Sequence, residues 1–507
     1  MWLLIVFVTY LVGVAAVGAY CARYNRTLAD FVLGGRRLGP WVTALSAQAS
    51  DMSAWLLIAL PATAFADPPS AIWAAIGCAI GTVFNWAVVA PRLRRESERS
   101  GALTIPDYLA ARYGGGRLPL VRVVSVLVIL TAYATYIASQ FMAAGKVFET
   151  TFGPHLGAGQ WALATPWGEL AYHHPYHTGM LAGVGIILLY TAMGGFTAVA
   201  WTDLVQGLLM VLTVLVLPLV GLTLPVTLTG PVGAAFVAPG PAQGTAFVVG
   251  VCIAGLSWGL GYPGQPHILV RFMALRDPKK MRRAAVIGIT WVILAMSGAI
   301  AVGLVGRRLV DGAALDTLTD ADHVMPALAV RLMPPALAGL MIAGAVAAMM
   351  STVDSQLLVA ASAVEEDIYI RLLGGRPGDR RAVWIGRITV LVLGAIALPI
   401  AWGRAGVFKT VFNAWGVLAA GIGPVVILAL LTRRTNRWGA FVGILAGAGI
   451  AQAWVWVGPI LPKDSLWGNG LILGFFANLI LAYVVSLLTG GSNRAETPAD
   501  RPRDERP

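Results

Sequence analysis

The sequence predicts an all-α polytopic membrane protein with about 13 transmembrane helices, because its apolar content is high and falls into windows of bilayer length. Hydrophobic residues make up 58% of the 507 residues, charged residues only 12%, and the mean hydropathy is +0.76. A soluble core of this size could not bury so much apolar surface. Windows of about 20 apolar residues, which cross a bilayer as helices, lie at approximately 2–21, 38–66, 70–91, 118–148, 177–192, 197–224, 243–273, 284–306, 336–370, 380–402, 408–431, 438–458 and 467–488.

The basic residues indicate how these helices are oriented. The net charge is +12, but Lys and Arg lie in short stretches between the apolar windows, which is typical of membrane topology and not of nucleic-acid binding. When alternate connections are taken as cytoplasmic, 29 of the 36 Lys and Arg fall on one side. We therefore expect a multi-pass protein of the cell inner (plasma) membrane, with the N-terminus outside and the C-terminus cytoplasmic.

The second window is polar at its centre, around Asp51. An aspartate at the middle of a spanning helix costs about 2.5–3.5 kcal/mol on insertion scales, so it is kept where it faces protein, an ion or water. The Ser, Gln and Ala residues around Asp51 indicate a helix that is broken or loosened there, and such backbone is tolerated at membrane depth only around a cavity or site. The alternative is a polar cluster that only bonds neighbouring helices.

The seventh window contains two prolines and four glycines within residues 255–267, so a continuous helix is not expected. Five windows separate its start from the start of the Asp51 window, so the two segments run in opposite directions through the membrane. This arrangement indicates an inverted-topology repeat, in which substrate and ion sites gather at the two discontinuous helices near the midplane.

The ninth window supplies hydroxyl groups. Ala348, Ser351 and Thr352 are spaced i, i+3 and i+4 and therefore share one face of a helix. Such hydroxyls often bond only to the carbonyls of their own helix. Sodium, however, prefers a few neutral or weakly charged oxygens, and two hydroxyls beside the carbonyls of a broken helix would supply them.

These residues resemble the sodium/solute symporter family, and within it the sodium/proline symporters. The similarity extends over nearly all the windows. It is carried by ALSA at 44–47, SDMSAWLL at 50–57, LTIPDY at 103–108, WTD at 201–203, WGLGY at 258–262, GQPH at 264–267 and MST at 350–352.

The resemblance implies a leucine-transporter-like core of two inverted five-helix repeats, at 38–224 and 243–432. A peripheral first helix and a cytoplasmic loop (1–37) would precede this transport core (38–432), and two peripheral helices (433–489) would follow it. The charged, proline-rich tail (490–507) has nothing to bury and is expected to be disordered.

The resemblance also implies the site residues. Sodium would be bound by the backbone carbonyls of Ala49, Met52 and Ala348 and by the hydroxyls of Ser351 and Thr352. Asp51 would support sodium binding from close by. The proline pocket would be formed by Ser53, Trp55, Tyr136, Trp258, Tyr262 and Pro266. Aromatic faces suit an aliphatic ring, and exposed backbone donors of a broken helix suit a carboxylate. Ala54, Gln48 and Pro263 depart from the proline carriers, and the methyl of Ala54 adds bulk beside the pocket.

Further acidic residues lie inside the windows. Asp203 and Asp354 have no evident Lys or Arg partner at membrane depth. Two such carboxylates are expected to bind a cation or to share protons. We therefore treat Asp203, Ser351, Asp354 and Ser355 as a candidate second cation site; the alternative is that Asp354 only hydrogen-bonds a neighbouring helix. The acidic run at 365–367 ends a long helix and is either a gate or a solvated face.

The expected function is import of L-proline by symport with sodium through alternating access. The alternatives are a sodium- or proton-coupled symporter of another small solute and a transporter-like sensory protein, although the short tail after the last window favours a carrier. No nucleophile and base constellation or H-E-x-x-H motif appears, so we expect neither an enzyme nor a metal site other than that for sodium.

Overall fold

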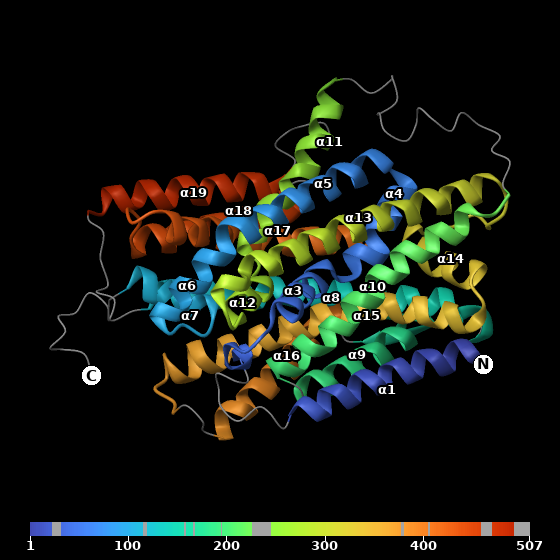
Figure 1. Cartoon of the computed structure of the whole chain (residues 1–507), viewed down its shortest axis with the longest axis horizontal. Coiled ribbons are helices and arrows are strands. Elements are labelled where there is room, and N and C mark those ends of the chain that lie inside the picture. Colours follow the sequence, from blue (N-terminus) through green and yellow to red (C-terminus); the bar gives the residue numbers. More distant parts are fainter. Residues whose placement is uncertain are drawn as a thin grey trace.

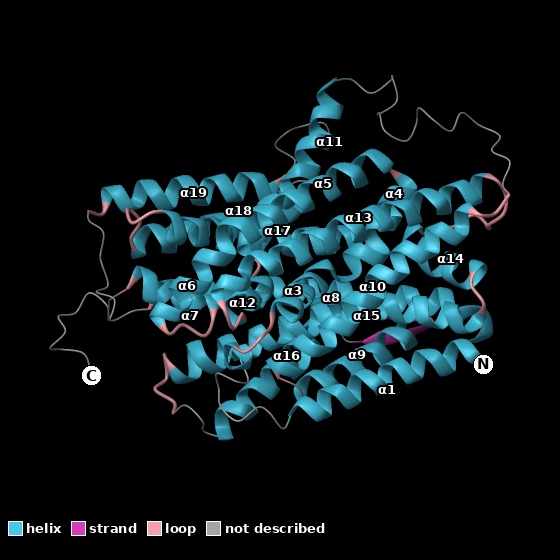
Figure 2. Cartoon of the chain, viewed as in Figure 1, coloured by secondary structure: helices cyan, strands magenta, loops and turns pink. Residues whose placement is uncertain are grey.

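The computed structural model describes residues 1–22, 32–114, 119–156, 159–165, 168–193, 195–225, 245–376, 380–403, 406–457 and 469–490. These residues are nearly all helical, with one short β-hairpin (Figure 2). The elements of the N-terminal half are α1 (Trp2–Ala22), η1 (Gly34–Arg36), α3 (Pro40–Ala54), η2 (Trp55–Ala59), α4 (Leu60–Ala66), α5 (Pro68–Phe84), η3 (Asn85–Val89), α6 (Ala90–Ser100), α7 (Ile105–Tyr113), α8 (Leu120–Leu156), β1 (Gly159–Thr165), β2 (Gly168–His174), α9 (Tyr176–Met193) and α10 (Phe196–Leu222).

The C-terminal half has the same character and continues the bundle (Figure 1). Its elements are α11 (Thr245–Ser257), η4 (Trp258–Gly264), α12 (Pro266–Ala274), η5 (Pro278–Lys280), α13 (Met281–Asp311), η6 (Ala321–His323), α14 (Val324–Leu332), α15 (Pro335–Ser362), η7 (Ala363–Ile370), α16 (Arg380–Trp402), α17 (Val407–Leu431), α18 (Arg437–Val457) and α19 (Gly470–Leu488). The predicted tail lies outside the described residues from residue 491 onward.

The described helices account for the expected spans. Ten are long and apolar enough to cross a membrane by length and composition, and two shorter apolar helices cover Trp2–Val17 and Tyr176–Leu189. The seventh expected span is the interrupted segment α11, η4 and α12, whose pieces are individually short. The prediction of a polytopic all-α protein is confirmed, while the residue bounds of the two repeats and of the peripheral helices stay predictions.

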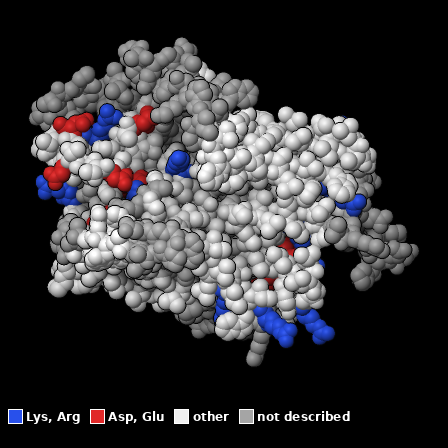
Figure 3. Space-filling view, turned by 180° about the vertical axis from the view of Figure 1, so that it is seen from behind, with Lys and Arg blue, Asp and Glu red and all other residues white. Residues whose placement is uncertain are grey.

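On the face in Figure 3, a broad part has no charged side chain among the described residues.

Both helices that were expected to be interrupted are interrupted. The backbone of the Asp51 segment leaves the helical region at Ser53 (φ 51°, ψ −166°), within the last two residues of α3 and just before the π-helical turn η2 begins at Trp55. In the other segment, α11 ends at Ser257, seven residues form a 3₁₀ turn, and Gln265 is extended before α12 begins at Pro266. Proline explains the second break, because its ring cannot continue a helix and lacks an amide donor.

The break in α3 lies at the centre of the bundle. Helix α3 contacts α10, α12, α13 and α15, and α15 in turn contacts α8 and α10. Residues 42–54 of α3 are all buried, as are nearly all residues of α15 from Ala338 onward. The polar stretch around Asp51 therefore faces protein on every side, and the structure excludes a position toward lipid.

Some elements were not foreseen. The third span continues beyond its apolar window through α6 to Ser100, because charged residues there sit at helical spacing and Arg94 pairs with Glu98 at 2.8 Å. Thr104 caps the N-terminus of helix α7, where its hydroxyl accepts a hydrogen bond from the Asp107 amide. The acidic run Glu365, Glu366 and Asp367 is buried, so its interpretation as a solvated face is wrong.

Candidate functional site

Two hydroxyls of α15 meet the last turn of α3 before its break. The Ser351 hydroxyl donates to the Ala49 carbonyl at 2.8 Å and is 3.0 Å from the Ala348 carbonyl of its own helix. The Thr352 hydroxyl donates to the Ser50 carbonyl at 2.9 Å. All these residues are fully buried. The structure thus brings four of the five predicted sodium ligands together, and it adds the Ser50 carbonyl, which was not predicted.

Met52, the fifth predicted ligand, is buried on the same turn of α3. Neighbouring Asp51 is only 4% exposed, and its Oδ2 atom has no hydrogen-bond partner among the described residues. The hydroxyl of Tyr262, on η4, is an electrostatic neighbour of this carboxylate. A buried carboxylate oxygen without a hydrogen-bond partner indicates a place for a cation.

The amides released by the break have side-chain acceptors. The Ala54 amide donates to Gln140 Oε1 at 2.8 Å, and the Trp55 amide donates to the Ser53 hydroxyl at 3.1 Å. Gln140 is fully buried on α8. Sequence reasoning missed it, although a glutamine inside an apolar window is a signal that a partner is needed.

The donor set fits a monovalent cation. It consists of neutral carbonyl and hydroxyl oxygens with one carboxylate nearby, which are hard ligands without nitrogen or sulfur. Each carbonyl has two lone pairs, so a carbonyl that accepts a hydroxyl proton retains capacity for a cation. These oxygens therefore suit sodium, treated as a transported substrate.

The predicted substrate residues lie beside this cation site. The indole rings of Trp55 and Trp258 stack with their centroids 4.2 Å apart and an interplanar angle of 20°. The Tyr136 hydroxyl is 3.5 Å from the Ser53 hydroxyl. Tyr262 packs edge-on against Trp415, with ring centroids 5.2 Å apart. All six predicted substrate residues are buried, including Pro266 at the start of α12.

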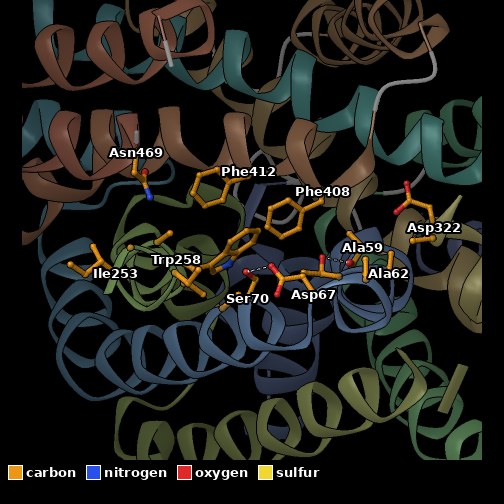
Figure 4. A pocket seen from close by; sticks show the side chains of 18 of the residues that line it. Ala59, Ala62, Asp67, Ser70, Ile253, Trp258, Asp322, Phe408, Phe412 and Asn469 are labelled. Atoms are coloured by element: carbon orange, nitrogen blue, oxygen red, sulfur yellow. Dashed lines mark hydrogen bonds between the residues drawn. The ribbon is translucent and has the colours of Figure 1, made fainter. Parts of the chain in front are cut away.

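A cavity of about 610 Å³ opens directly outside this stack. Figure 4 shows Trp258, Phe408 and Phe412 side by side on its wall, with a hydrogen bond between Ser70 and Asp67. The Trp258 ring lies 5.3 Å from Phe412 and 5.9 Å from Phe408. Of the predicted substrate residues, Trp258 alone lines this cavity. The two phenylalanines were missed because aromatic residues in α17 could equally face lipid.

The opposite end of the bundle, where α6, α7 and α12 lie together (Figure 1), is closed by arginines. The Arg36 guanidinium bonds Ser97, the Met273 carbonyl and the Ala102 carbonyl. Arg122 pairs with Asp107 at 2.9 Å and with Asp367 at 2.5 Å. The described structure therefore has an open cavity on one side of the stacked tryptophans and tight polar contacts at the other end.

The expectation that Asp203 has no basic partner within the membrane is wrong. Arg271, which was counted with the basic loop after the seventh span, is fully buried on α12 and lies 3.3 Å from Asp203. Moving Arg271 out of that loop leaves the charge asymmetry of the loops intact. Asp354 bonds the Thr191 hydroxyl, and one of its oxygens has no partner among the described residues.

The variant Gly264→Ala tests whether the 3₁₀ turn η4 packs directly against the backbone of α17. A Cβ atom at Gly264 would be 2.5 Å from the Leu418 carbonyl oxygen and 2.9 Å from Ala419 Cα, and backbone atoms cannot move aside. Because overpacking costs about 1–3 kcal/mol, we expect Gly264→Ala to lower the thermal unfolding midpoint in detergent by a few degrees. Gly449→Ala is the control, since nothing lies within 4 Å of its Cβ position. Equal midpoints for the two variants would contradict the close approach.

Comparisons with known proteins agree with this geometry. The family model described as the sodium:solute symporter family matches residues 31–167 and 169–447. The chain is 37% identical over 489 residues to the high-affinity proline transporter PutP of Bacillus subtilis, covering 95% of this chain and 97% of that protein. It is 35% identical over 489 residues to a sodium/proline symporter of Staphylococcus aureus, covering 94% and 91% of the two chains.

Solved structures show the same fold. A Na⁺-coupled sialic acid symporter aligns with a TM-score of 0.76 and 18% identity, covering 97% of this chain and 99% of the other. Mhp1, a nucleobase-cation-symport-1 family transporter, aligns with a TM-score of 0.54 and 15% identity, covering 92% and 97%. The fold is thus the leucine-transporter-like fold that the resemblance to the family implied. With a family model that matches most of its length and relatives above 30% identity over nearly all of it, this chain belongs to the sodium:solute symporter family.

Proposed function

We propose that this chain imports L-proline together with sodium across the cell membrane by alternating access. The observation that carries the proposal is the meeting of the Ser351 and Thr352 hydroxyls with the carbonyls of Ala49 and Ser50, one turn before the break in α3. The names of the relatives supply the substrate, because those proteins are proline transporters and sodium/proline symporters.

Sodium would act on the broken helix. An ion between Ala49, Met52 and Ala348 carbonyls and the two α15 hydroxyls, supported by Asp51, would hold α3 against α15 and fix the backbone at Ser53. Two of the substrate residues, Ser53 and Trp55, lie at that break, so an ordered break favours an ordered pocket. Because coupling between two ligands is reciprocal, proline would raise the affinity for sodium by the same factor.

Proline would bind where the two helix breaks face each other. Ser53, Tyr136 and the start of α12 at Pro266 offer polar groups for the zwitterion, and Trp55, Trp258 and Tyr262 offer faces for the ring. The two tryptophan rings touch in the described structure, so they would separate to admit the substrate from the cavity. The Ala54 methyl adds bulk there and would favour a small solute.

The proposed topology places the cavity on the outer side, and the sodium gradient and membrane potential set the direction of transport. With the N-terminus outside and the C-terminus cytoplasmic, the cavity lined by Asp67 and Ser70 opens outward and the arginine-rich end lies in the cytoplasm. For one sodium per proline, a potential of about 100 mV contributes about 2.3 kcal/mol. A tenfold sodium gradient adds about 1.4 kcal/mol, which together support accumulation of roughly several hundredfold.

Uptake into proteoliposomes tests the function. The purified protein would be reconstituted, and labelled L-proline uptake measured with an inward sodium gradient, with potassium in place of sodium, and with a proton gradient alone. Accumulation only with sodium is the expected result, and excess unlabelled solutes would define the substrate. Uptake that is indifferent to sodium, or that another small solute competes away better than proline, would contradict the proposal.

The variant Trp258→Ala is expected to weaken proline binding without changing sodium binding. Removing its ring in Trp258→Ala takes away a stacking face worth about 0.5–1.5 kcal/mol, so we expect the KM for proline to rise by about 2- to 12-fold. Sodium binding without proline should stay unchanged, because Trp258 lies on η4 and the proposed sodium ligands lie on α3 and α15. Trp456→Ala is the control, since that side chain is 76% exposed on α18. An unchanged KM for proline would place the substrate elsewhere.

A further inference from the structure

A fully buried arginine lies at the residues of the candidate second cation site. The Arg271 guanidinium contacts Asp203 Oδ2 at 3.3 Å, the Ser46 hydroxyl at 3.2 Å and the His267 carbonyl at 2.8 Å. It also donates to the Ser355 hydroxyl. Both Arg271 and Asp203 have no solvent exposure, so their charges are compensated by each other and by these polar groups.

The same oxygens would be the ligands of a small cation. The hydroxyls of Ser46 and Ser50 donate to Asp203 Oδ2 at 2.7 and 3.1 Å, and the Ser50 and Ser355 hydroxyls are 2.8 Å apart. One carboxylate and three hydroxyls from α3, α10 and α15 thus converge on one point. The Arg271 guanidinium, from α12, occupies the place where these oxygens meet. It carries five N–H donors and no acceptor, so the groups around it must be hydrogen-bond acceptors.

A second mobile cation and the guanidinium exclude each other. A cation bound by Asp203 and Ser355 would lie within a few ångströms of a positive charge in a buried place, where like charges repel strongly and salt cannot screen them. The pair Arg271 and Asp203 is already neutral, so the Asp203 carboxylate does not attract a further cation. The proposed sodium site beside Asp51 has no such resident charge among the described residues.

We propose that Arg271 is a resident cation that occupies the place of a second coupling ion, so that the transporter binds one sodium ion. This inference rests on the proposed function and deepens it, because it assigns the ion stoichiometry to a named side chain. It replaces the hypothesis that Asp203, Asp354 and Ser355 bind a second mobile cation. In this proposal Arg271 is also a positioning residue. It links α12 to α3, α10 and α15 and, unlike a coupling ion, stays bound to the protein.

The test is the number of sodium ions bound per protein. Equilibrium binding of ²²Na⁺ would be measured without proline on the purified full chain in lipid nanodiscs. We expect one ion for the wild type with a Hill coefficient of about 1, and two ions for Arg271→Gln, in which the Asp203 carboxylate loses its partner. The double variant Arg271→Gln/Asp203→Asn should return to one ion. Arg94→Gln is the control, since it removes a buried arginine that bonds Leu275 and Glu98 instead.

The outcomes are distinct. Two ions in the wild type, or one ion in a monodisperse Arg271→Gln protein, would overturn the role of Arg271. No saturable ²²Na⁺ binding in the wild type would instead overturn the proposed sodium coupling itself. If Arg271→Gln does not fold, the uncharged double variant and Arg271→Lys, which keeps a positive charge, take its place. Both should then bind one ion, and two ions in Arg271→Lys would contradict the proposal.

Discussion

Replacing Ser351 and Thr352 together by alanine is expected to abolish sodium-dependent proline uptake at physiological sodium. The two hydroxyls are the groups of α15 that reach the carbonyls of Ala49 and Ser50, at 2.8 and 2.9 Å. A hydrogen-bond-type contact to a charged group is worth about 1.5–3 kcal/mol, so each single variant should lose about 10- to 100-fold in sodium affinity. Sodium titrations of ²²Na⁺ binding without proline measure this directly.

A matched hydroxyl elsewhere controls for the loss of a buried polar group. Ser125 on α8 is fully buried, and its hydroxyl donates only to the Val121 carbonyl of its own helix at 2.6 Å. Ser125→Ala should therefore leave sodium binding unchanged. At very high sodium the single variants should recover proline uptake, since the substrate residues are untouched. Unaltered sodium affinity in both single variants would mean that the ion does not bind between α3 and α15.

The two helix breaks were predictable because their causes are local. Proline and glycine in 255–267 prevent a continuous helix, and a polar cluster around Asp51 is too costly for a lipid-facing helix. The position of the first break was less accessible. It lies at Ser53, where a non-glycine residue has φ 51°, and the Ala54 amide that follows depends on Gln140 from a different helix. Only the tertiary structure supplies that partner.

Arg271 shows why the charged part of the site escaped prediction. It follows the apolar residues of the seventh window and precedes a basic loop, so its sequence context is that of a cytoplasmic arginine. The extended backbone at Gln265 redirects the chain, and the short helix α12 then places Arg271 against α3, α10 and α15. No periodicity in the sequence records this change of direction. The aromatic wall of Phe408 and Phe412 likewise depends on which face of α17 turns inward.

Asp51→Asn is expected to separate the electrostatic role of this carboxylate from a structural one. Asp51 is 4% exposed, and one of its oxygens has no hydrogen-bond partner among the described residues. A buried carboxylate without a counter-charge costs several kcal/mol, and a sodium ion close by offsets that cost. We therefore expect the variant to lose about 100-fold or more in sodium affinity, which corresponds to about 2.8 kcal/mol.

Asp51→Asn should weaken sodium binding, but it should raise thermal stability when sodium is absent. In choline buffer Asp51→Asn should unfold at a higher temperature than the wild type, because the amide removes the uncompensated charge while it keeps the shape of the side chain. Added sodium should raise the unfolding temperature of the wild type in proportion to the logarithm of its concentration, and should leave the variant unchanged. Asp311→Asn serves as the control, since that carboxylate is 63% exposed and pairs only loosely with Arg307 at 3.9 Å. A variant less stable in choline that still gains stability from sodium would show that Asp51 holds the helices together, and that the charge the ion neutralises lies elsewhere.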